Sequence, residues 1–326
     1  MTRSDAPVVS VRDVIKDFRP GFGVRKKRVL HGIGFEVQPG ELFGFVGPNG
    51  AGKTTTLKIL LGLIRATSGE ASILGHRVRE TAFRREVGFL PENPYFYDFL
   101  TGREILRFYA KLCGVDGAAR ERRVGELLER VGLDHAADAR LRTYSTGMLQ
   151  RVGIAQALVH DPKVVFLDEP MSGLDPLGRK EIRDLSVALH AEGTTIFMNT
   201  HILTDVEMLC DRVAIIVKGR IRYEGRIEVF LEGDARLCDV VLANVPPELA
   251  EAVEGRYDAV LGGRGENVEF RVAEKHAGEL VRTAVDAGAS LRSVTPHRVS
   301  LESIFIHAVE EEARERISTG DGEVTA

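Results

Sequence analysis

The sequence predicts an α/β fold with a largely parallel sheet, followed by a smaller α+β unit. Apolar runs at 164–167 and 195–198 each follow a helical stretch, which is typical of buried parallel strands. A glycine-rich turn joins a predicted strand at 41–46 to helical spacing at 53–63. From Leu231 onward there are 19 acidic and 10 basic side chains, a charge of −9 against +5 for the preceding part, so we expect a domain boundary close to that residue.

The N-terminal part contains further strands and a helical insertion. Residues 8–11 and 30–37 have the alternation of early strands. Two helical patterns, at 104–113 and 120–131, lie between strand-like segments. We therefore expect a helical subdomain over about 93–160.

The segment after residue 235 changes to the order strand, helix, two strands, helix and strand. This order resembles a ferredoxin-like unit, and its predicted elements lie at 239–242, 247–253, around Gly262-Gly263, at 277–287 and at 291–294. An amphipathic helix at 301–317 closes the pattern. The expected domains are a large N-terminal domain at 1–230, a small α+β accessory domain at 236–317 and a disordered tail at 318–326.

Composition excludes several classes of protein. The chain is 44% hydrophobic and 28% charged, as is ordinary for a soluble globular protein. Its longest apolar runs are strand-sized and fall short of the roughly 20 residues that a membrane-spanning helix needs. The first residues lack the apolar core of a secretory signal and the 3 cysteines are far apart, so we expect a reducing cytoplasm without disulfides. A net charge of −4 gives no support for nucleic-acid binding.

The turn between the predicted strand and helix has the spacing of a P-loop. Its glycines allow backbone N–H groups to turn toward phosphate oxygens, and the helix that begins near Lys53 adds its positive end. Lys53 is expected to reach the β- and γ-phosphates, and the Thr54 hydroxyl to ligate Mg²⁺. The predicted phosphate-binding residues are Gly47, Pro48, Asn49, Gly50, Ala51, Gly52, Lys53, Thr54 and Thr55.

A second acidic motif completes the predicted site. The apolar strand at 164–167 delivers Asp168 at its carboxyl end, where a carboxylate is expected to hold the Mg²⁺ shell. The next residue, Glu169, is a second carboxylate, and polarisation of an attacking water requires such a group. Together the two motifs predict an NTPase.

Two further motifs resemble those of the ATP-binding cassette (ABC) family. The segment 143–151, Thr-Tyr-Ser-Thr-Gly-Met-Leu-Gln-Arg, resembles the ABC signature, and 172–176, Ser-Gly-Leu-Asp-Pro, resembles the D-loop, with Asp175 as its acidic residue. The resemblance covers about 8–230 and implies an ABC cassette with antiparallel β and helical subdomains. It also implies head-to-tail dimers, homomeric or heteromeric, in which the signature residues Ser145, Thr146, Gly147 and Met148 act in trans on nucleotide held by the partner's P-loop.

The resemblance assigns three more residues. His201 matches the switch histidine that contacts the γ-phosphate, and Phe18 matches the aromatic that stacks on adenine. Glu92 stands where the family has a Q-loop glutamine; a carboxylate offers oxygen to Mg²⁺ but donates no hydrogen bond. The signature departs as well, with Thr146 and Met148 in place of the preferred Gly and Gln.

These motifs predict the ATP-binding and ATP-hydrolysing subunit of an ABC transporter, with ATP and Mg²⁺ as cofactors. The expected catalytic residues are Glu169 and His201. The resemblance implies separate transmembrane permease subunits, export as the direction of transport, and a peripheral position on the cytoplasmic face of the inner membrane, without nucleic acid. The alternatives are an ABC-type ATPase that acts on nucleic acid or ribosomes, and a scaffold that binds nucleotide without turnover.

Overall fold

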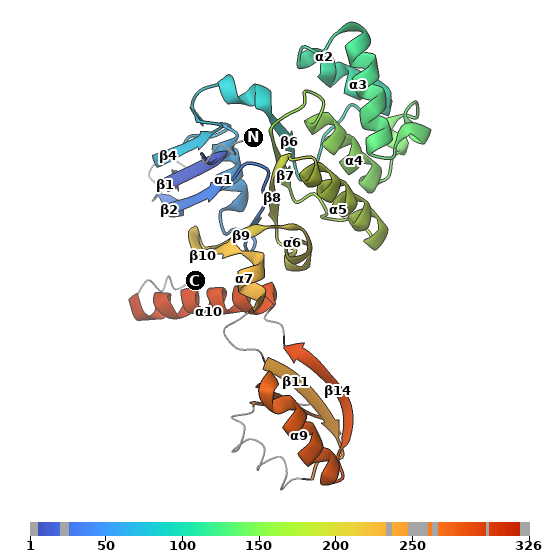
Figure 1. Ribbon diagram of the computed structural model, residues 1–326. Helices are drawn as coiled ribbons and strands as arrows, with labels where there is room; N and C mark the ends of the chain where they lie inside the picture. Colours follow the sequence, from blue (N-terminus) through green and yellow to red (C-terminus); the bar gives the residue numbers. More distant parts are fainter. Residues whose placement is uncertain are drawn as a thin grey trace. The chain divides into compact units, whose positions relative to one another are not determined.

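The computed structural model describes residues 6–19, 26–232, 237–246, 260–262, 267–297 and 300–319. The chain divides into two compact units (Figure 1). The first unit comprises Met1–Ile227 with Phe305–Ala326, and the second comprises Glu228–Ile304.

A six-stranded, mostly parallel sheet forms the centre of the first unit. Its strand order is β10-β9-β3-β8-β7-β6, with only the edge strand β10 antiparallel to its neighbour. The strands are β3 (Leu42–Val46), β6 (Val87–Leu90), β7 (Val164–Asp168), β8 (Thr195–Thr200), β9 (Arg212–Val217) and β10 (Arg220–Arg226). Every residue of β3, β7 and β8 is buried, as expected of parallel strands covered on both faces.

A second, antiparallel sheet packs against the central one in the same unit. Its order is β2-β1-β4-β5, formed by β1 (Val9–Phe18), β2 (Lys27–Val37), β4 (Ser68–Ile73) and β5 (His76–Arg77). Phenylalanine rings join the two sheets, since Phe35 of β2 lies 5.2 Å from Phe45 and 5.9 Å from Phe197, measured between ring centroids. β1 and β2 are longer than predicted because pairing with each other extends them beyond the apolar runs.

Helices cover the sheets and form a separate lobe (Figure 1). α1 (Lys53–Leu60) follows β3, α5 (Pro176–Ala191) follows β7 and α6 (Leu203–Leu209) follows β8. The lobe contains α2 (Gly102–Leu112), α3 (Gly117–Arg130) and α4 (Thr146–Ala157), in agreement with the predicted helical patterns. α2 begins at a capping box in which the Thr101 hydroxyl accepts from the Glu104 N–H and the Glu104 carboxylate accepts from the Thr101 N–H.

The second unit contains a four-stranded antiparallel sheet of order β12-β13-β11-β14 and the helix α9 (Glu274–Asp286). Its strands are β11 (Leu237–Ala243), β12 (Val260–Gly262), β13 (Asn267–Ala273) and β14 (Ser290–His297). The predicted helix at 247–253 lies outside the described residues, so the ferredoxin-like assignment stays a prediction. α7 (Ile227–Glu232) lies at the division between the two units.

The closing helix, α10 (Leu301–Thr319), differs from expectation. It extends two residues past the predicted end at 317, and from Phe305 it belongs with the first unit, although we expected all of it in the accessory domain. Side chains of β10 hold it there, since Arg222 forms an ion pair with Glu312 and the Tyr223 hydroxyl donates to the Glu311 carboxylate at 3.4 Å, and Ala308 of α10 is fully buried. Residues 320–326 of the predicted tail lie outside the described residues.

Candidate functional site

The sequence-predicted site residues meet at the carboxyl ends of three parallel strands. The loop 47–52 follows β3, Asp168 ends β7, and His201 follows β8. Ligands of open α/β sheets bind at this edge. A cavity of about 540 Å³ opens there, lined by Lys27, Val29, Asn49, Gly50, Gly52, Lys53, Thr54, Thr55, Glu92, Glu169, Ser172 and His201.

The loop between β3 and α1 requires glycine at three positions. Gly50 and Gly52 have φ angles of 77° and 109°, which side-chain-bearing residues rarely adopt. A Cβ at Gly47 would lie 2.3 Å from the backbone oxygen of Ile216 on β9. The backbone therefore turns closely over the sheet edge, and the residues that begin α1, Lys53, Thr54 and Thr55, line the cavity.

Lys53 holds a positive charge at the bottom of this loop. Its side chain is buried, its Nζ donates to the Gly47 carbonyl at 2.8 Å, and it lies 3.7 Å from a Glu169 oxygen. Burial lowers the pKa of Lys53, while the carboxylates of Glu169 and Asp168 oppose that shift. The ammonium group is thus placed where it can bind an anion at the mouth of the loop.

Asp168 is a buried carboxylate whose surroundings suit a cation. Burial raises the pKa of Asp168, and a hydrogen bond donated by the Asn199 side-chain amide opposes this rise. The Oδ1 atom of Asn199 is buried and has no hydrogen-bond partner within the described part of the chain. A bound cation would favour the ionised carboxylate and offset its desolvation.

Glu169 is held by the segment that follows β8. Its Oε2 accepts hydrogen bonds from the Thr200 hydroxyl at 3.3 Å and the His201 backbone N–H at 3.4 Å, and lies 2.8 Å from His201 Nδ1. The backbone of Glu169 has a φ of 49°, an uncommon conformation for a residue with a side chain. This turn directs a buried carboxylate into the cavity, where it can accept a proton from water.

The oxygen donors at the site fit Mg²⁺. Mg²⁺ usually takes one or two carboxylates together with substrate phosphates and water, and Thr54, Asp168 and Glu92 supply hydroxyl and carboxylate oxygens. Thr54 and Glu92 line the cavity, and the negative charge of Glu92 acts on the pKa of both Lys53 and Asp168. In the described residues no group of three or more His, Cys, Asp or Glu side chains could hold a metal without a ligand.

Phe18 lies near the cavity but is not part of its lining. It ends β1 opposite Lys27 of β2, which does line the cavity. The ring is 39% exposed, and the Nζ of Lys16 lies 4.8 Å from its centroid. A flat, accessible ring at this position remains available for stacking on a base.

The signature and D-loop residues lie elsewhere in the chain. Ser145 caps α4 and its hydroxyl accepts the Met148 N–H at 3.2 Å, as expected for a helix that begins at this motif. Asp175 caps α5 by accepting the Gly178 N–H at 2.8 Å. Neither residue lines the 540 Å³ cavity. Thr146 instead lines a smaller neighbouring cavity of about 320 Å³, to which Glu92 also contributes.

Five residues of the site were not predicted individually, among them Asn199, whose side-chain amide donates to Asp168. Lys27 and Val29 line the cavity from β2, and Ser172 lines it from the turn after β7. Thr200, like His201, supports Glu169 through a hydrogen bond. Ser172 lies inside the D-loop segment and Thr200 directly precedes His201, whereas the two β2 residues carry no sequence signal because a contact between β2 and the glycine loop, at Val29 and Gly52, places them there.

Comparison with known proteins connects this geometry to one family. The family model described as ABC transporter matches residues 30–172. An uncharacterized ABC transporter ATP-binding protein of Synechocystis is 44% identical over 94% of this chain and 86% of its own length. The bacitracin transport ATP-binding protein BcrA of Bacillus licheniformis is also 44% identical, over 87% of this chain and 93% of its own length. The Nod factor export ATP-binding protein I of Burkholderia pseudomallei is 42% identical, over 66% of this chain and 71% of its own length.

Comparison with solved structures leads to the same family. The chain is similar, with a TM-score of 0.61 and 33% identity, to an ATP-binding subunit of an ABC transporter, covering 68% of this chain and 91% of that one. It is also similar, with a TM-score of 0.61 and 26% identity, to an ATP-binding cassette in a dimeric post-hydrolysis state bound to ADP and Pi. That similarity covers 67% of this chain and 98% of the other. Among the described residues, the helices are all too short or too polar to cross a bilayer.

Proposed function

Because this chain belongs to the ABC transporter ATP-binding proteins, whose members act with membrane subunits and form cassette dimers, we propose that it hydrolyses MgATP to drive transport. It is the ATP-binding subunit of such a transporter. Relatives named for bacitracin transport and Nod factor export support export as the direction. We place the subunit on the cytoplasmic face of the inner membrane, beside permease subunits.

The observation that carries the proposal is the arrangement of Lys53, Glu169 and His201 around one glycine loop. The loop and the first turn of α1 supply N–H donors for phosphate oxygens, and the buried ammonium of Lys53 adds charge-assisted binding. Thr54, Asp168 and Glu92 would hold Mg²⁺, which when bound supplies positive charge to the phosphates. We assign stacking on adenine to Phe18, which ends β1 opposite the cavity residue Lys27.

The same residues divide the work of hydrolysis. Glu169, held by Thr200 and His201, accepts a proton from the attacking water. His201 is about half exposed at the cavity, so it positions the carboxylate on one side while it faces the substrate on the other. Lys53 stabilises the negative charge that develops on the transferred phosphoryl group.

The signature residues require a second cassette. Ser145, Thr146, Gly147 and Met148 lie at the start of α4, and Asp175 lies at the start of α5, outside the cavity lining of their own chain. A helix N-terminus capped by a serine is an anion-binding element. In a head-to-tail dimer it would close over nucleotide bound to the partner's loop. The chemistry is the same for a homodimer and a heterodimer.

The test is Glu169→Gln. We expect MgATP affinity within about threefold of wild type and a loss of turnover of roughly 10²–10⁴-fold, the usual contribution of a general base. Affinity is measured by calorimetry and turnover by phosphate release from the purified chain. Asp184→Asn is the matched control, because Asp184 is an exposed carboxylate on α5 away from the cavity. Normal turnover in Glu169→Gln refutes the assignment of the base.

A further inference from the structure

A second cavity in the first unit gathers arginine side chains away from the glycine loop. It has a volume of about 280 Å³ and lies between the end of α1, the strands β4 and β5, and the short helix η1 (Ala82–Glu86). Four arginines line it, Arg65, Arg77, Arg79 and Arg84, against the single acidic residue Glu70. The cavity shares no lining residue with the nucleotide site.

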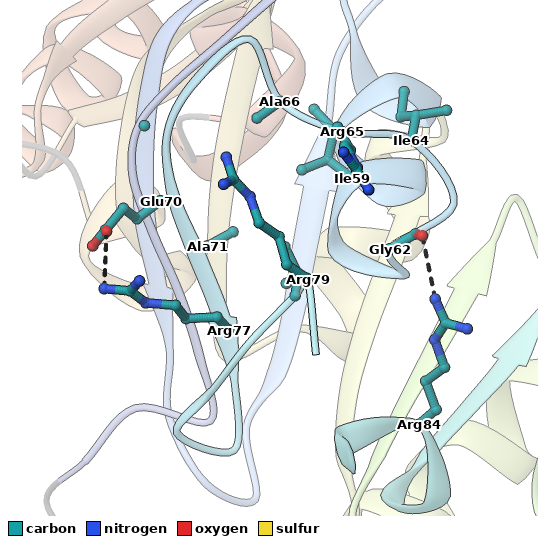
Figure 2. Close-up of a pocket in the computed structure, with 12 residues that line it drawn as sticks. Ile59, Gly62, Ile64, Arg65, Ala66, Glu70, Ala71, Arg77, Arg79 and Arg84 are labelled. Carbon is teal, nitrogen blue, oxygen red and sulfur yellow. Dashed lines mark hydrogen bonds and ion pairs between the residues drawn. The ribbon is translucent and has the colours of Figure 1, made fainter. Parts of the chain in front are cut away.

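Only one of these arginines is neutralised by a carboxylate. Arg77 pairs with Glu70 at 3.3 Å, and both side chains are largely exposed. Arg84 donates to the neutral Gly62 carbonyl at 3.3 Å (Figure 2), which engages one of its five N–H donors. Within the described parts of the chain, Arg65 and Arg79 form no ion pair with a carboxylate. The cavity therefore carries an excess of positive charge.

Hydrogen bonds fix the backbone around the cavity, and the four arginine side chains that it carries are solvent-exposed. The Arg65 carbonyl accepts a hydrogen bond from Lys16 Nζ at 2.6 Å, and the Val78 N–H donates to Ala71 at 3.0 Å. A Cβ at Gly62 would lie 3.1 Å from Arg84 Nη2, so glycine at this position leaves room for the guanidinium. Figure 2 shows Arg79 extended across the cavity between Ala71 and Ala66.

We propose that this arginine cavity binds a small ligand that carries a phosphate group. Guanidinium groups match phosphate oxygens in a bidentate geometry. A phosphate monoester carries up to two negative charges and three acceptor oxygens, and so satisfies several guanidinium groups where a lone carboxylate carries one charge. Apolar residues also contribute to the lining, namely Ile59, Ile64, Ala66, Ala71 and Val78. A volume near 280 Å³ fits a phosphorylated polyol, such as a glycerol phosphate, rather than a whole nucleotide.

The phosphate could come from a soluble metabolite or from a lipid headgroup, and two probes separate these sources. The first is glycerol 3-phosphate, titrated by calorimetry with saturating MgADP present so that the glycine loop is filled. The second is vesicles of phosphatidylcholine containing phosphatidic acid, in a co-sedimentation assay. Binding to glycerol 3-phosphate identifies a soluble ligand, and binding only to the vesicles identifies a headgroup; either result supports the site.

Matched variants separate a built site from general positive charge. R65Q/R79Q removes two cavity arginines, and K58Q/R85Q removes two exposed cations of α1 and η1 that do not line the cavity. We expect R65Q/R79Q to lose at least about tenfold in affinity, since each arginine makes charge-assisted bonds, and K58Q/R85Q to stay within threefold. If R65Q/R79Q loses its fold in thermal unfolding, R79Q alone is tested with R85Q as its control.

Two results would overturn the proposal. One is the absence of binding to both probes by the wild-type chain. The other is an equal loss in R65Q/R79Q and K58Q/R85Q, since that outcome assigns the affinity to net charge and not to the cavity. Neither result bears on turnover of MgATP, which is measured in parallel and is expected to be unchanged in both double variants.

Discussion

Removal of the His201 side chain tests how Glu169 is positioned. In the structure His201 Nδ1 lies 2.8 Å from Glu169 Oε2, and the carboxylate is otherwise held at Oε2 by the longer bonds from Thr200 and the His201 backbone N–H. A hydrogen bond to a charged group contributes about 1.5–3 kcal/mol. At 1.36 kcal/mol for each factor of ten, its loss in the transition state predicts a decrease in kcat of roughly 10- to 150-fold for His201→Ala.

The assay is steady-state phosphate release at saturating MgATP, with thermal unfolding as a check on the fold. The side chain of His201 is 48% exposed, so its removal opens no cavity in the core, and the loss of its hydrogen bond to Glu169 is expected to lower the unfolding free energy by about 1.5–3 kcal/mol. His201→Gln keeps a donor and should recover part of the lost turnover, whereas His135→Ala, an exposed histidine of the helical lobe, should leave turnover unchanged.

Two outcomes contradict the reasoning. If kcat of His201→Ala stays within threefold of wild type, the bond to Glu169 does not contribute to catalysis. If the decrease equals that of Glu169→Gln and His201→Gln restores nothing, His201 acts on the reacting atoms itself and positioning of the carboxylate is the wrong description.

Three further predictions follow from local geometry. Gly47→Ala places a Cβ 2.3 Å from a backbone oxygen of β9, so we expect about 1–3 kcal/mol less stability and weaker MgATP binding, measured by urea unfolding and calorimetry; unchanged values contradict the close approach. Burial lowers the pKa of His160 below its ordinary 6.5, so the unfolded chain binds more protons and stability falls as the pH drops through about 6.5. His160→Gln, which keeps a donor for the Val87 carbonyl, should lose less stability between pH 7.5 and 5.5; an equal loss excludes this histidine. Ser145→Ala removes the cap of α4 and should cost about 1 kcal/mol, while MgATP binding persists and turnover falls; full turnover contradicts a role in trans.

Sequence reasoning located the site because its motifs are local. The glycine loop, the Asp168-Glu169 pair and His201 each follow a predicted buried strand, and the parallel sheet brings those strand ends together. Phosphate chemistry then gives each residue type a role. The prediction of the α/β fold and of the cassette is confirmed by the strand order and by the solved relatives.

Contacts between distant segments could not be predicted from the sequence. Lys27 lines the cavity because β2 lies beside the glycine loop, where Val29 approaches Gly52, and one contact that joins α10 to β10 is the ion pair of Arg222 with Glu312, 90 residues apart. The Asn199 amide bonds Asp168 only because β7 and β8 are adjacent and in register. The arginines of the second cavity are spread over a loop, a strand end and η1, and show no periodic pattern.

Three residues of the site are held in states that cost free energy and that a bound ligand would contact. Glu169 adopts a positive φ, at a cost of about 1–2 kcal/mol, and burial disfavours the charged forms of Lys53 and Asp168. Such costs persist only where surrounding structure enforces them, here the bonds from Thr200 and His201. Phosphate oxygens at Lys53 and a cation at Asp168 would each favour the charged form that burial opposes. Binding of MgATP is therefore expected to offset the cost of burying these two charges, which the cassette bears when it is empty.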